Sequence, residues 1–319
     1  MIPPDLILTD MNPAEKISLG RRHAAFAALL AVSVALFWAP LRKIVGLSWS
    51  DDRYSHLMLI PLISACLVYW EREKIFSQPK DRGGTGFFLL LGAAVVYALA
   101  ALGPLGSNGH LALSILSVIL VWAATFATCY GSRALRAAAF PWCFLAFMIP
   151  LPESVLNWMV QALQSASAEV SAVLFRAIGM PSFRRGFRFL LPGVEIEIAN
   201  ECSGIRSTFA LVLVSVLAGY MLLRSTSRRI CFALAAIPIG ILKNAVRIVS
   251  LSYLAVYVDR AYLEGKLHHQ YGGLIFSSLS MLLWIPLLIL LRKSEPRSKP
   301  GSEVPGPSLP LPTTEDIVS

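Results

Sequence analysis

The sequence contains few charged residues for its length. Asp, Glu, Lys and Arg make up 15% of its 319 residues, whereas a soluble globular protein carries about 25%. This deficit excludes a soluble enzyme, and it equally excludes a disordered regulator, which depends on high charge. The chain is also 56% hydrophobic, with a mean hydropathy of +0.64. The length alone would suggest two soluble domains, but the composition predicts a membrane protein with several spans.

Cysteine is also sparse, and its spacing predicts no shared structural role. The five cysteines contain no Cys-x-x-Cys pair; they are Cys66, Cys129, Cys143, Cys202 and Cys231. An odd number without paired spacing predicts neither a disulfide framework nor a structural zinc site. The pair His268-His269 lacks further ligands at metal spacing, so the sequence predicts no metal and no organic cofactor.

Charge-free runs mark the expected membrane spans, because about 20 apolar residues cross the hydrocarbon core of a bilayer. We predict an all-α polytopic membrane protein with about eight transmembrane helices, within a membrane domain of residues 23–292. The expected spans lie within residues 23–41, 54–70, 83–132 (two helices), 137–152, 207–223, 230–251 and 267–291. The first run lacks a small-residue cleavage site, which favours an anchor over a signal peptide.

The distribution of Lys and Arg predicts the orientation of these spans. The net charge is +9, and an eight-span topology places most basic loops together on one side, which should be the cytoplasm. This explains the basic excess without nucleic acid as a partner. The N-terminal segment 1–22 and the Pro- and Ser-rich tail 293–319, predicted to be disordered, then both lie in the cytoplasm.

Residues 153–206 form the one sizeable segment expected outside the membrane, on the external face before the sixth span. The stretch Val155–Ile178 has the pattern of a short amphipathic helix at the membrane interface. Residues 187–198 alternate apolar and charged side chains around Pro192-Gly193, which is typical of a β-hairpin. The segment leads directly into a polar stretch around Cys202.

Three reactive side chains are expected at one depth on the external face. Cys202 precedes the sixth span, Arg247 lies toward the outer end of the seventh, and His268 lies at the mouth of the eighth. Polar groups at the membrane edge are energetically costly, which makes them functional candidates. A cation lowers the pKa of a nucleophilic thiol, an imidazole exchanges protons with a leaving amine, and a guanidinium stabilises an oxyanion. Together these groups predict thiol-based acyl transfer.

Each of these residues also has a plainly structural interpretation. A cysteine in a membrane protein is most often a small buried hydrophobe. Arg247 could serve only to reach the lipid headgroups, an interpretation that Lys243, one turn earlier and deeper, shares. His268 and His269 could be interfacial polar residues. The combination favours chemistry, because three separate helix ends agree. Nearby, Gly204 would let substrate backbone approach closely.

Three blocks of sequence surround these residues. They are Asn200-Glu201-Cys202-Ser203-Gly204-Ile205-Arg206-Ser207, Lys243-Asn244-Ala245-Val246-Arg247-Ile248, and His268-x-x-x-Gly272-x-x-x-Phe276. They resemble the signature blocks of the exosortase/archaeosortase family, the cysteine block most specifically. Earlier segments are similar to the family too: Tyr54-Ser55-His56, residues 147–152 and Gly186. The resemblance spans about residues 50–292.

This resemblance implies a cysteine protease or transpeptidase of the bacterial inner membrane. Cys202 would be the nucleophile, Arg247 the electrostatic stabiliser, and His268, chosen over His269 for its spacing to Gly272, the acid and base. Supporting roles would fall to Asn244, Arg206 and Gly204. The implied substrates are exported proteins that end in a short motif such as Pro-Glu-Pro, a transmembrane helix and a basic cluster. Cleavage through a cysteine thioester would pass them to a surface acceptor, often in organisms that make exopolysaccharide.

Three other functions remain open from the residues alone. A non-enzymatic transporter or assembly factor for surface polysaccharide export would show paired charges at the bilayer midplane and broken helices in matching halves, which we do not find in the sequence. A serine protease built on Ser203 would lack the G-x-S-x-G elbow. A thiol-disulfide oxidoreductase would need a second cysteine at the external face, where none is expected.

Overall fold

The computed structural model describes residues 13–78, 81, 83–104, 106–199, 203–259 and 272–295, and the structural statements below concern these residues. The chain is mostly helical. Its helices are α1 (Pro13–Leu36), α2 (Trp38–Ser50), the 3-10 helix η1 (Asp52–Tyr54), α3 (Leu59–Trp70), α4 (Arg72–Phe76), α5 (Thr85–Leu102), α6 (Ser107–Tyr130), α7 (Ser132–Ala137), α8 (Ala139–Phe144), the 3-10 helix η2 (Leu145–Met148), α9 (Glu153–Ala177), α10 (Ile205–Leu222), α11 (Thr226–Tyr257) and α13 (Gly272–Lys293). A small sheet contains β1 (Phe183–Arg185), β2 (Arg188–Leu191) and β3 (Val194–Glu197).

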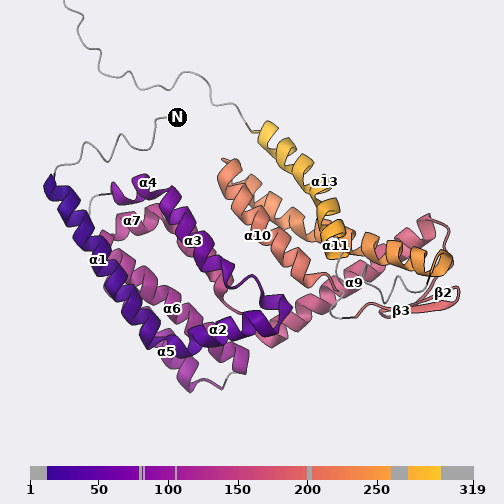
Figure 1. Cartoon of the computed structure of the whole chain (residues 1–319), viewed down its shortest axis with the longest axis horizontal. Coiled ribbons are helices and arrows are strands. Elements are labelled where there is room, and N and C mark those ends of the chain that lie inside the picture. The colour runs from indigo at the N-terminus through magenta and orange to yellow at the C-terminus, as the bar shows by residue number, and fades with distance from the viewer. Residues whose placement is uncertain are drawn as a thin grey trace, which may run out of the picture.

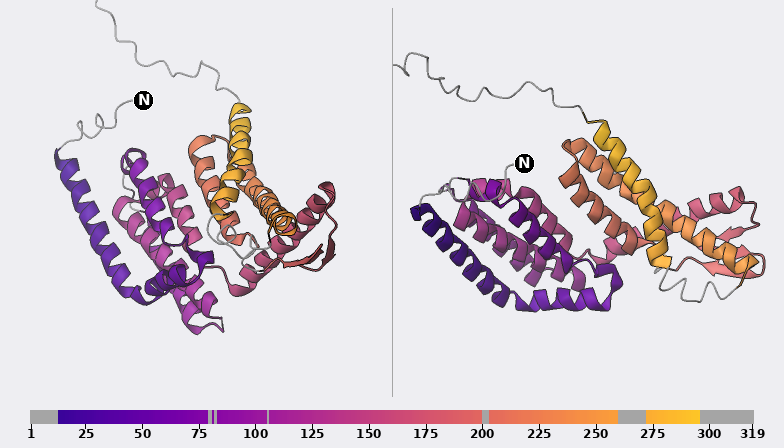
Figure 2. Two further views of the ribbon diagram at one scale, coloured as in Figure 1. Left: turned by 45° about the vertical axis from the view of Figure 1, so that its right-hand side comes forward. Right: turned by 45° about the horizontal axis from the view of Figure 1, so that its top comes forward.

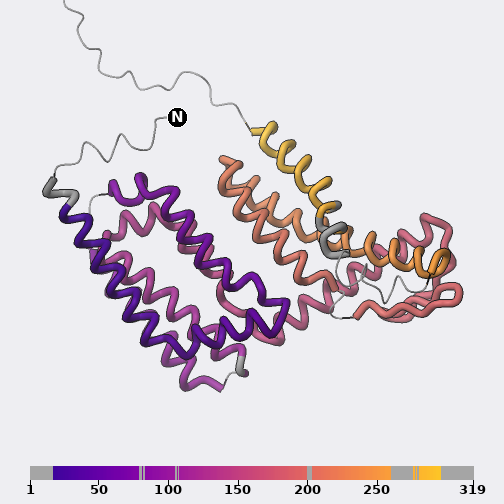
Figure 3. The backbone as a smooth tube through the Cα atoms, viewed as in Figure 1, coloured from indigo at the N-terminus to yellow at the C-terminus, as the bar shows by residue number. Residues whose placement is uncertain are grey.

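The helices form two groups that α9 connects. Helices α1 to α7 pack together on the N-terminal side, and α10, α11 and α13 form the second group (Figure 1). The two further views keep this arrangement, with the sheet beyond the second group (Figure 2). The backbone trace places the sheet beside the end of α11, at the far end of the molecule from α1 (Figure 3). The largest apolar core joins the groups, since it contains buried residues of α2, α3, α6, α9 and α10.

Five of the described helices are long and apolar enough to cross a membrane. They are Ile17–Leu36 in α1, Thr85–Leu102 in α5, Asn108–Tyr130 in α6, Ile205–Leu222 in α10 and Thr226–Tyr257 in α11. A sixth candidate is the pair Ala139–Met148 and Glu153–Ala177, which is bent by 88°. The chain is therefore a multi-pass membrane protein, and the described residues do not confirm the expected count of eight spans.

Two expected spans are wrong as single full-length helices. The run 54–70 contains only the 12 residues of α3 as an α-helix, about 18 Å at 1.5 Å per residue, against a hydrocarbon core of about 30 Å. The run 137–152 contains the six-residue α8 and a 3-10 turn. Pro61 and Pro141 lie in the first turns of α3 and α8, where a missing N–H has no helical acceptor to lose. A charge-free run shows apolar composition and not helix continuity.

The first expected run, 23–41, is also divided. Helix α1 ends at Leu36 and α2 begins at Trp38, with Pro40 in the first turn of α2. A proline at this position cannot donate to the carbonyl four residues earlier, which favours the break between the two helices. The division leaves Ile17–Leu36 as the membrane-crossing length.

The amphipathic helix expected at Val155–Ile178 is present as α9, but it is not only a surface helix. Eight of its residues are buried, and they include the polar Gln164, Ser167 and Ser171 at helical spacing. This polar face packs against α11. The hydrophilic residues that suggested contact with water or headgroups are therefore used inside the protein.

The strands expected around Pro192-Gly193 pair as an antiparallel hairpin of β2 and β3, with Arg188 opposite Glu197 and Leu191 opposite Val194. Gly193 has a φ of +75°, which the turn requires and which glycine adopts without strain. An additional strand, β1, pairs antiparallel with β2. Phe189 and Leu191 pack with residues of α9 and α11 in a second apolar cluster. The external position of this sheet stays a prediction.

Candidate functional site

Helix α10 begins within the cysteine block, at Ile205. Cys202 and the two residues before it lie outside the described residues, and Ser203 is the first described residue after them. Ser203 is 1% exposed, and its Oγ accepts a hydrogen bond from the backbone N–H of Ile205 at 3.3 Å. Gly204 is the residue before the first helical turn and has a φ of +79°. The block therefore contains a tight turn that leads into the N-terminus of a candidate membrane span.

This turn packs against the arginine block on α11. A Cβ added to Gly204 would lie 3.0 Å from Cγ of Asn244 and 3.2 Å from its Cβ. Asn244 is 2% exposed, so the contact is interior. The structure thus brings together two blocks that are 40 residues apart in sequence. Gly204 does allow a close approach, but the observed neighbour is Asn244, and the expected approach of substrate is not tested.

We predict that Gly204→Ala lowers the free energy of unfolding by about 1–3 kcal/mol, because alanine at positive φ is strained and its Cβ meets Asn244. A denaturant titration in mixed micelles would measure the change. Gly179 has a φ of +71° with nothing within 4 Å, so Gly179→Ala gives the cost of strain alone. Gly92 has open space and a helical φ, so Gly92→Ala should not destabilise the protein. Equal losses at Gly204 and Gly179 would contradict the role of the Asn244 contact.

Arg247 lies one turn beyond Asn244 on α11, about 4.5 Å further along the helix axis. Its side chain is half-buried. Lys243 is 8% exposed, and both Arg247 and Arg206 lie close enough to act on its ammonium electrostatically. Three cations from two helices therefore lie close to one another near the start of α10, where they could stabilise an anion such as a thiolate or oxyanion.

The sequence predicted a span over residues 230–251, with Arg247 toward its outer end. The observed helix α11 extends beyond this boundary. Helix α11 continues to Tyr257, ten residues or about 15 Å beyond Arg247. Val249 and Val256, in this extension, pack with the sheet and α9, which explains why the helix does not stop at the expected boundary. The contact between Gly204 and Asn244 places Arg247 one helical turn from the start of α10, and its depth in the membrane stays a prediction.

Helix α9 holds both sides of the cysteine block. Gln164 is 3% exposed and donates from Nε2 to the backbone oxygen of Ile198 at 2.8 Å. One turn later, Ser167 Oγ accepts from Asn244 Nδ2 at 3.1 Å. Ile198 precedes the cysteine block, and Asn244 touches the turn that follows it. Both hydrogen bonds are buried, so losing either would leave an unsatisfied polar group and destabilise the arrangement. The sequence did not indicate this role for Gln164 or Ser167, whose only signal is helical spacing.

The segment around η1 contacts this helix start. Asp52 accepts a hydrogen bond from the Arg206 guanidinium, with both side chains largely exposed, at 82% and 62%. This exposure places Arg206 at the rim of the site. An exposed ion pair contributes at most about 1 kcal/mol to stability. The His56 ring stacks on Phe209, with centroids 5.6 Å apart and planes 12° from parallel. Burial lowers the pKa of His56, despite an opposing backbone hydrogen bond with Arg53.

His56 thus stacks on a residue of α10 that lies five positions after Gly204, and the residues alone gave it no role. The signal that could have found it is the Tyr54-Ser55-His56 segment noted above. His268 and His269, between which the sequence left the acid and base open, lie outside the described residues. Within the part of the chain that the structure describes, no group of three or more His, Cys, Asp or Glu could hold a metal ion.

The comparisons with known proteins give one match. The family model of the transmembrane exosortase matches residues 48–285, about three quarters of the chain, and covers α3 to α11 with all three blocks. No curated protein and no solved structure matches the sequence significantly. The matched region contains Gly204, Asn244 and Arg247, whose arrangement is described above. The chain belongs to the transmembrane exosortase family.

Proposed function

We propose that this protein is a membrane-embedded cysteine protease and transpeptidase that cleaves the C-terminal sorting signals of exported proteins. The observation that carries the proposal is the interior contact between Gly204 and Asn244. It joins the helix start that follows Cys202 to the turn that bears Arg247, in a chain of the exosortase family. Of the three expected supporting residues, Gly204 and Asn244 form this junction, and Arg206 lies in the first turn of α10 beside it.

In the proposed reaction, the Cys202 thiolate attacks the scissile carbonyl carbon, and a C–S bond forms. The cations of α11 and the N-terminus of α10 favour the thiolate over the thiol. Arg247 stabilises the oxyanion of the tetrahedral intermediate. The C–N bond then breaks, and His268 gives the leaving amine its proton. An acceptor nucleophile attacks the resulting thioester, its proton passes to His268, and the thiolate is regenerated.

The proposed location is the inner membrane of a bacterium, with both termini in the cytoplasm and the site at the external face. The basic residues Arg224, Arg228 and Arg229 support this orientation. They lie between the end of α10 and the first turn of α11. Because α10 has 18 residues, this cluster is about 27 Å from the helix start near Cys202. The site and the basic connection therefore lie at opposite ends of the same span.

Capture of the thioester would test the proposal. The chain is co-expressed with an exported protein that ends in a motif, a transmembrane helix and a basic cluster, and the substrate mass is followed. We expect a shortened product, and added hydroxylamine should convert its new C-terminus to a hydroxamate, because hydroxylamine intercepts acyl-enzymes. Processing that yields only a free carboxylate in saturating hydroxylamine, with no acyl adduct on Cys202, would contradict the thioester step.

A further inference from the structure

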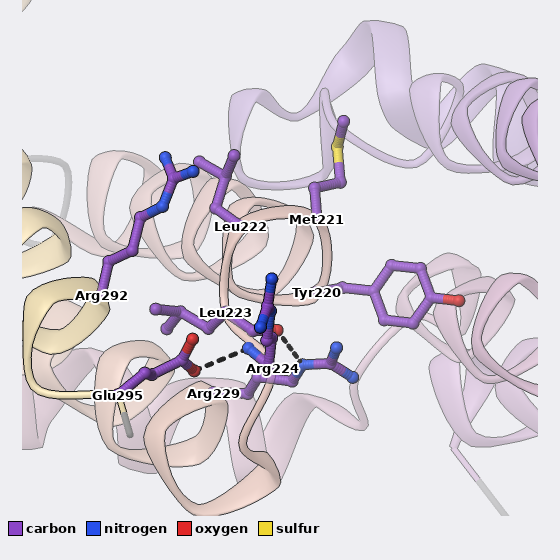
Figure 4. A pocket seen from close by; sticks show the side chains of 8 residues that line it. All are labelled: Tyr220, Met221, Leu222, Leu223, Arg224, Arg229, Arg292 and Glu295. Atoms are coloured by element: carbon purple, nitrogen blue, oxygen red, sulfur yellow. Dashed lines mark hydrogen bonds between the residues drawn. The ribbon is translucent and has the colours of Figure 1, made fainter. Parts of the chain in front are cut away.

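A cavity lies at the other end of α10, away from the proposed active site. Its volume is about 450 Å³, and the end of α10, the start of α11 and the end of α13 line it (Figure 4). Arg229 belongs to its wall and lies 18 residues before Arg247 on α11, about 27 Å along the helix. The cavity is therefore outside the proposed reaction site.

Three arginines from three different segments line this cavity: Arg224, Arg229 and Arg292. Figure 4 shows them around the end of α10. Arg229 has partners of its own, since its Nε donates to the Leu223 oxygen at 2.8 Å and its guanidinium lies 5.0 Å from the centre of the Tyr220 ring. Among the described residues, neither Arg224 nor Arg292 forms an ion pair within 4.0 Å, although Glu295 attracts Arg224 electrostatically.

One carboxylate, Glu295, also lines the cavity, and it is already engaged. Its Oε1 accepts the backbone N–H groups of Arg224 at 2.7 Å and Ser225 at 3.1 Å, ahead of the first turn of α11. These hydrogen bonds, with nearby Arg228, hold the pKa of Glu295 below its usual range. The Glu295 carboxylate thus interacts with the start of α11. Three arginines against this one carboxylate leave the cavity with an excess of positive charge.

Apolar side chains continue from the cavity onto the protein surface. Met221 is 43% exposed and Leu222 is 41% exposed, both in the last turn of α10, and both line the cavity. Arginine binds phosphate through paired N–H groups, and basic pockets between membrane helices accommodate anionic lipid headgroups. Inorganic phosphate would bind the arginines but would make no favourable contact with the apolar side chains beside them.

We propose that this cavity binds the phosphate headgroup of an anionic phospholipid, with its acyl chains along the Met221 and Leu222 side of α10. The lipid would come from the leaflet next to the basic connection between α10 and α11. It would add a bridge between three helices that already meet here through the hydrogen bonds of Glu295 and Arg228 and through an apolar cluster, and it would hold α13 against the start of α11. The proposal does not depend on the reaction at the opposite end.

Thermal unfolding of the purified full chain in detergent tests this site. Dioctanoylphosphatidylglycerol should raise Tm in a saturable manner, because a ligand that binds only the folded state stabilises it. Dioctanoylphosphatidylcholine and inorganic phosphate at equal concentration should give little or no shift. An equal shift from either of them would overturn the proposal, since the site would then lack selectivity for an anionic lipid.

Charge removal at the cavity gives the matching test. The double variant Arg224→Gln and Arg292→Gln should bind phosphatidylglycerol at least about tenfold more weakly, because each lost charged hydrogen bond removes about that factor. Arg133→Gln is the control, since Arg133 is an exposed arginine of α7 outside the cavity. The conservative pair Arg224→Lys and Arg292→Lys should retain most of the shift. Unchanged affinity in the Gln pair, or equal loss in the control, would overturn the site.

Discussion

Replacing Cys202 with alanine should abolish processing of the substrate, with a loss of at least about a thousandfold in rate. A covalent mechanism has no alternative path once its nucleophile is removed, and such losses reach on the order of 10⁶-fold in hydrolases. Replacing Cys231 with alanine should leave the rate unchanged. Cys231 is an exposed thiol of α11, about 24 Å along the helix from Arg247. The measurement is the fraction of substrate shortened, at equal amounts of enzyme in the membrane.

Ser203 provides the second control, because a serine protease was an alternative from the residues alone. Its side chain is buried, and its hydroxyl accepts the N–H of Ile205. Ser203→Ala should therefore weaken the turn without removing the reaction, and a loss of about tenfold or less is expected. If Ser203→Ala abolished processing while Cys202→Ala preserved it, the nucleophile would be the serine hydroxyl and the cysteine mechanism would be wrong.

The features that the sequence predicted well are those set by local composition. Helices α5, α6 and α10 correspond to long runs with few or no charged residues. A membrane span must satisfy its backbone hydrogen bonds within the helix, and charged side chains inside the bilayer are energetically costly. The hairpin of β2 and β3 follows from alternation around Pro192-Gly193, where a glycine with positive φ is required. In each of these elements the determinant lies within about 20 residues of sequence.

The features that the sequence did not predict depend on packing between distant segments. Pro40, Pro61 and Pro141 divide apolar runs that hydropathy treats as continuous. The buried polar face of α9 has the same pattern as a face that contacts water, and only its partner Asn244 distinguishes them. A sequence pattern does not identify such a partner, because it records spacing along one helix and not what lies opposite.

The sequence predicted which residue types belong to the candidate site, but only part of how they are arranged in space. The sequence expected the blocks of Cys202 and Arg247 at one depth, and Gly204 does touch Asn244, one turn from Arg247. It did not indicate Gln164 and Ser167 on α9, or the stacking of His56 on Phe209. These residues hold or cover the site through single long-range contacts, which periodicity does not report.

Replacing Arg247 with alanine should lower processing by about 10²–10³-fold, the cost of removing one preorganised oxyanion donor. Arg247→Lys should recover part of this loss, because a lysine keeps the charge but not the planar pair of N–H groups. A change in fold would lower activity in both variants alike. The partial rescue therefore separates an electrostatic role from a structural one.

The pH dependence of Cys202 alkylation gives an independent measurement of the same role. If Arg247 stabilises the thiolate, its removal raises the thiol pKa, so the alkylation rate of Arg247→Ala should reach half of its maximum at a higher pH than that of the unmodified chain. Arg247→Lys should shift this midpoint less, since Lys243 and the new lysine would still place two cations near the start of α10. Arg188→Ala is the matched control, because this exposed arginine of β2 pairs only with Glu195 and Glu197 on β3 among the described residues. An unchanged alkylation midpoint in Arg247→Ala, with processing as fast as in Arg188→Ala, would show that Arg247 serves only to reach the headgroups.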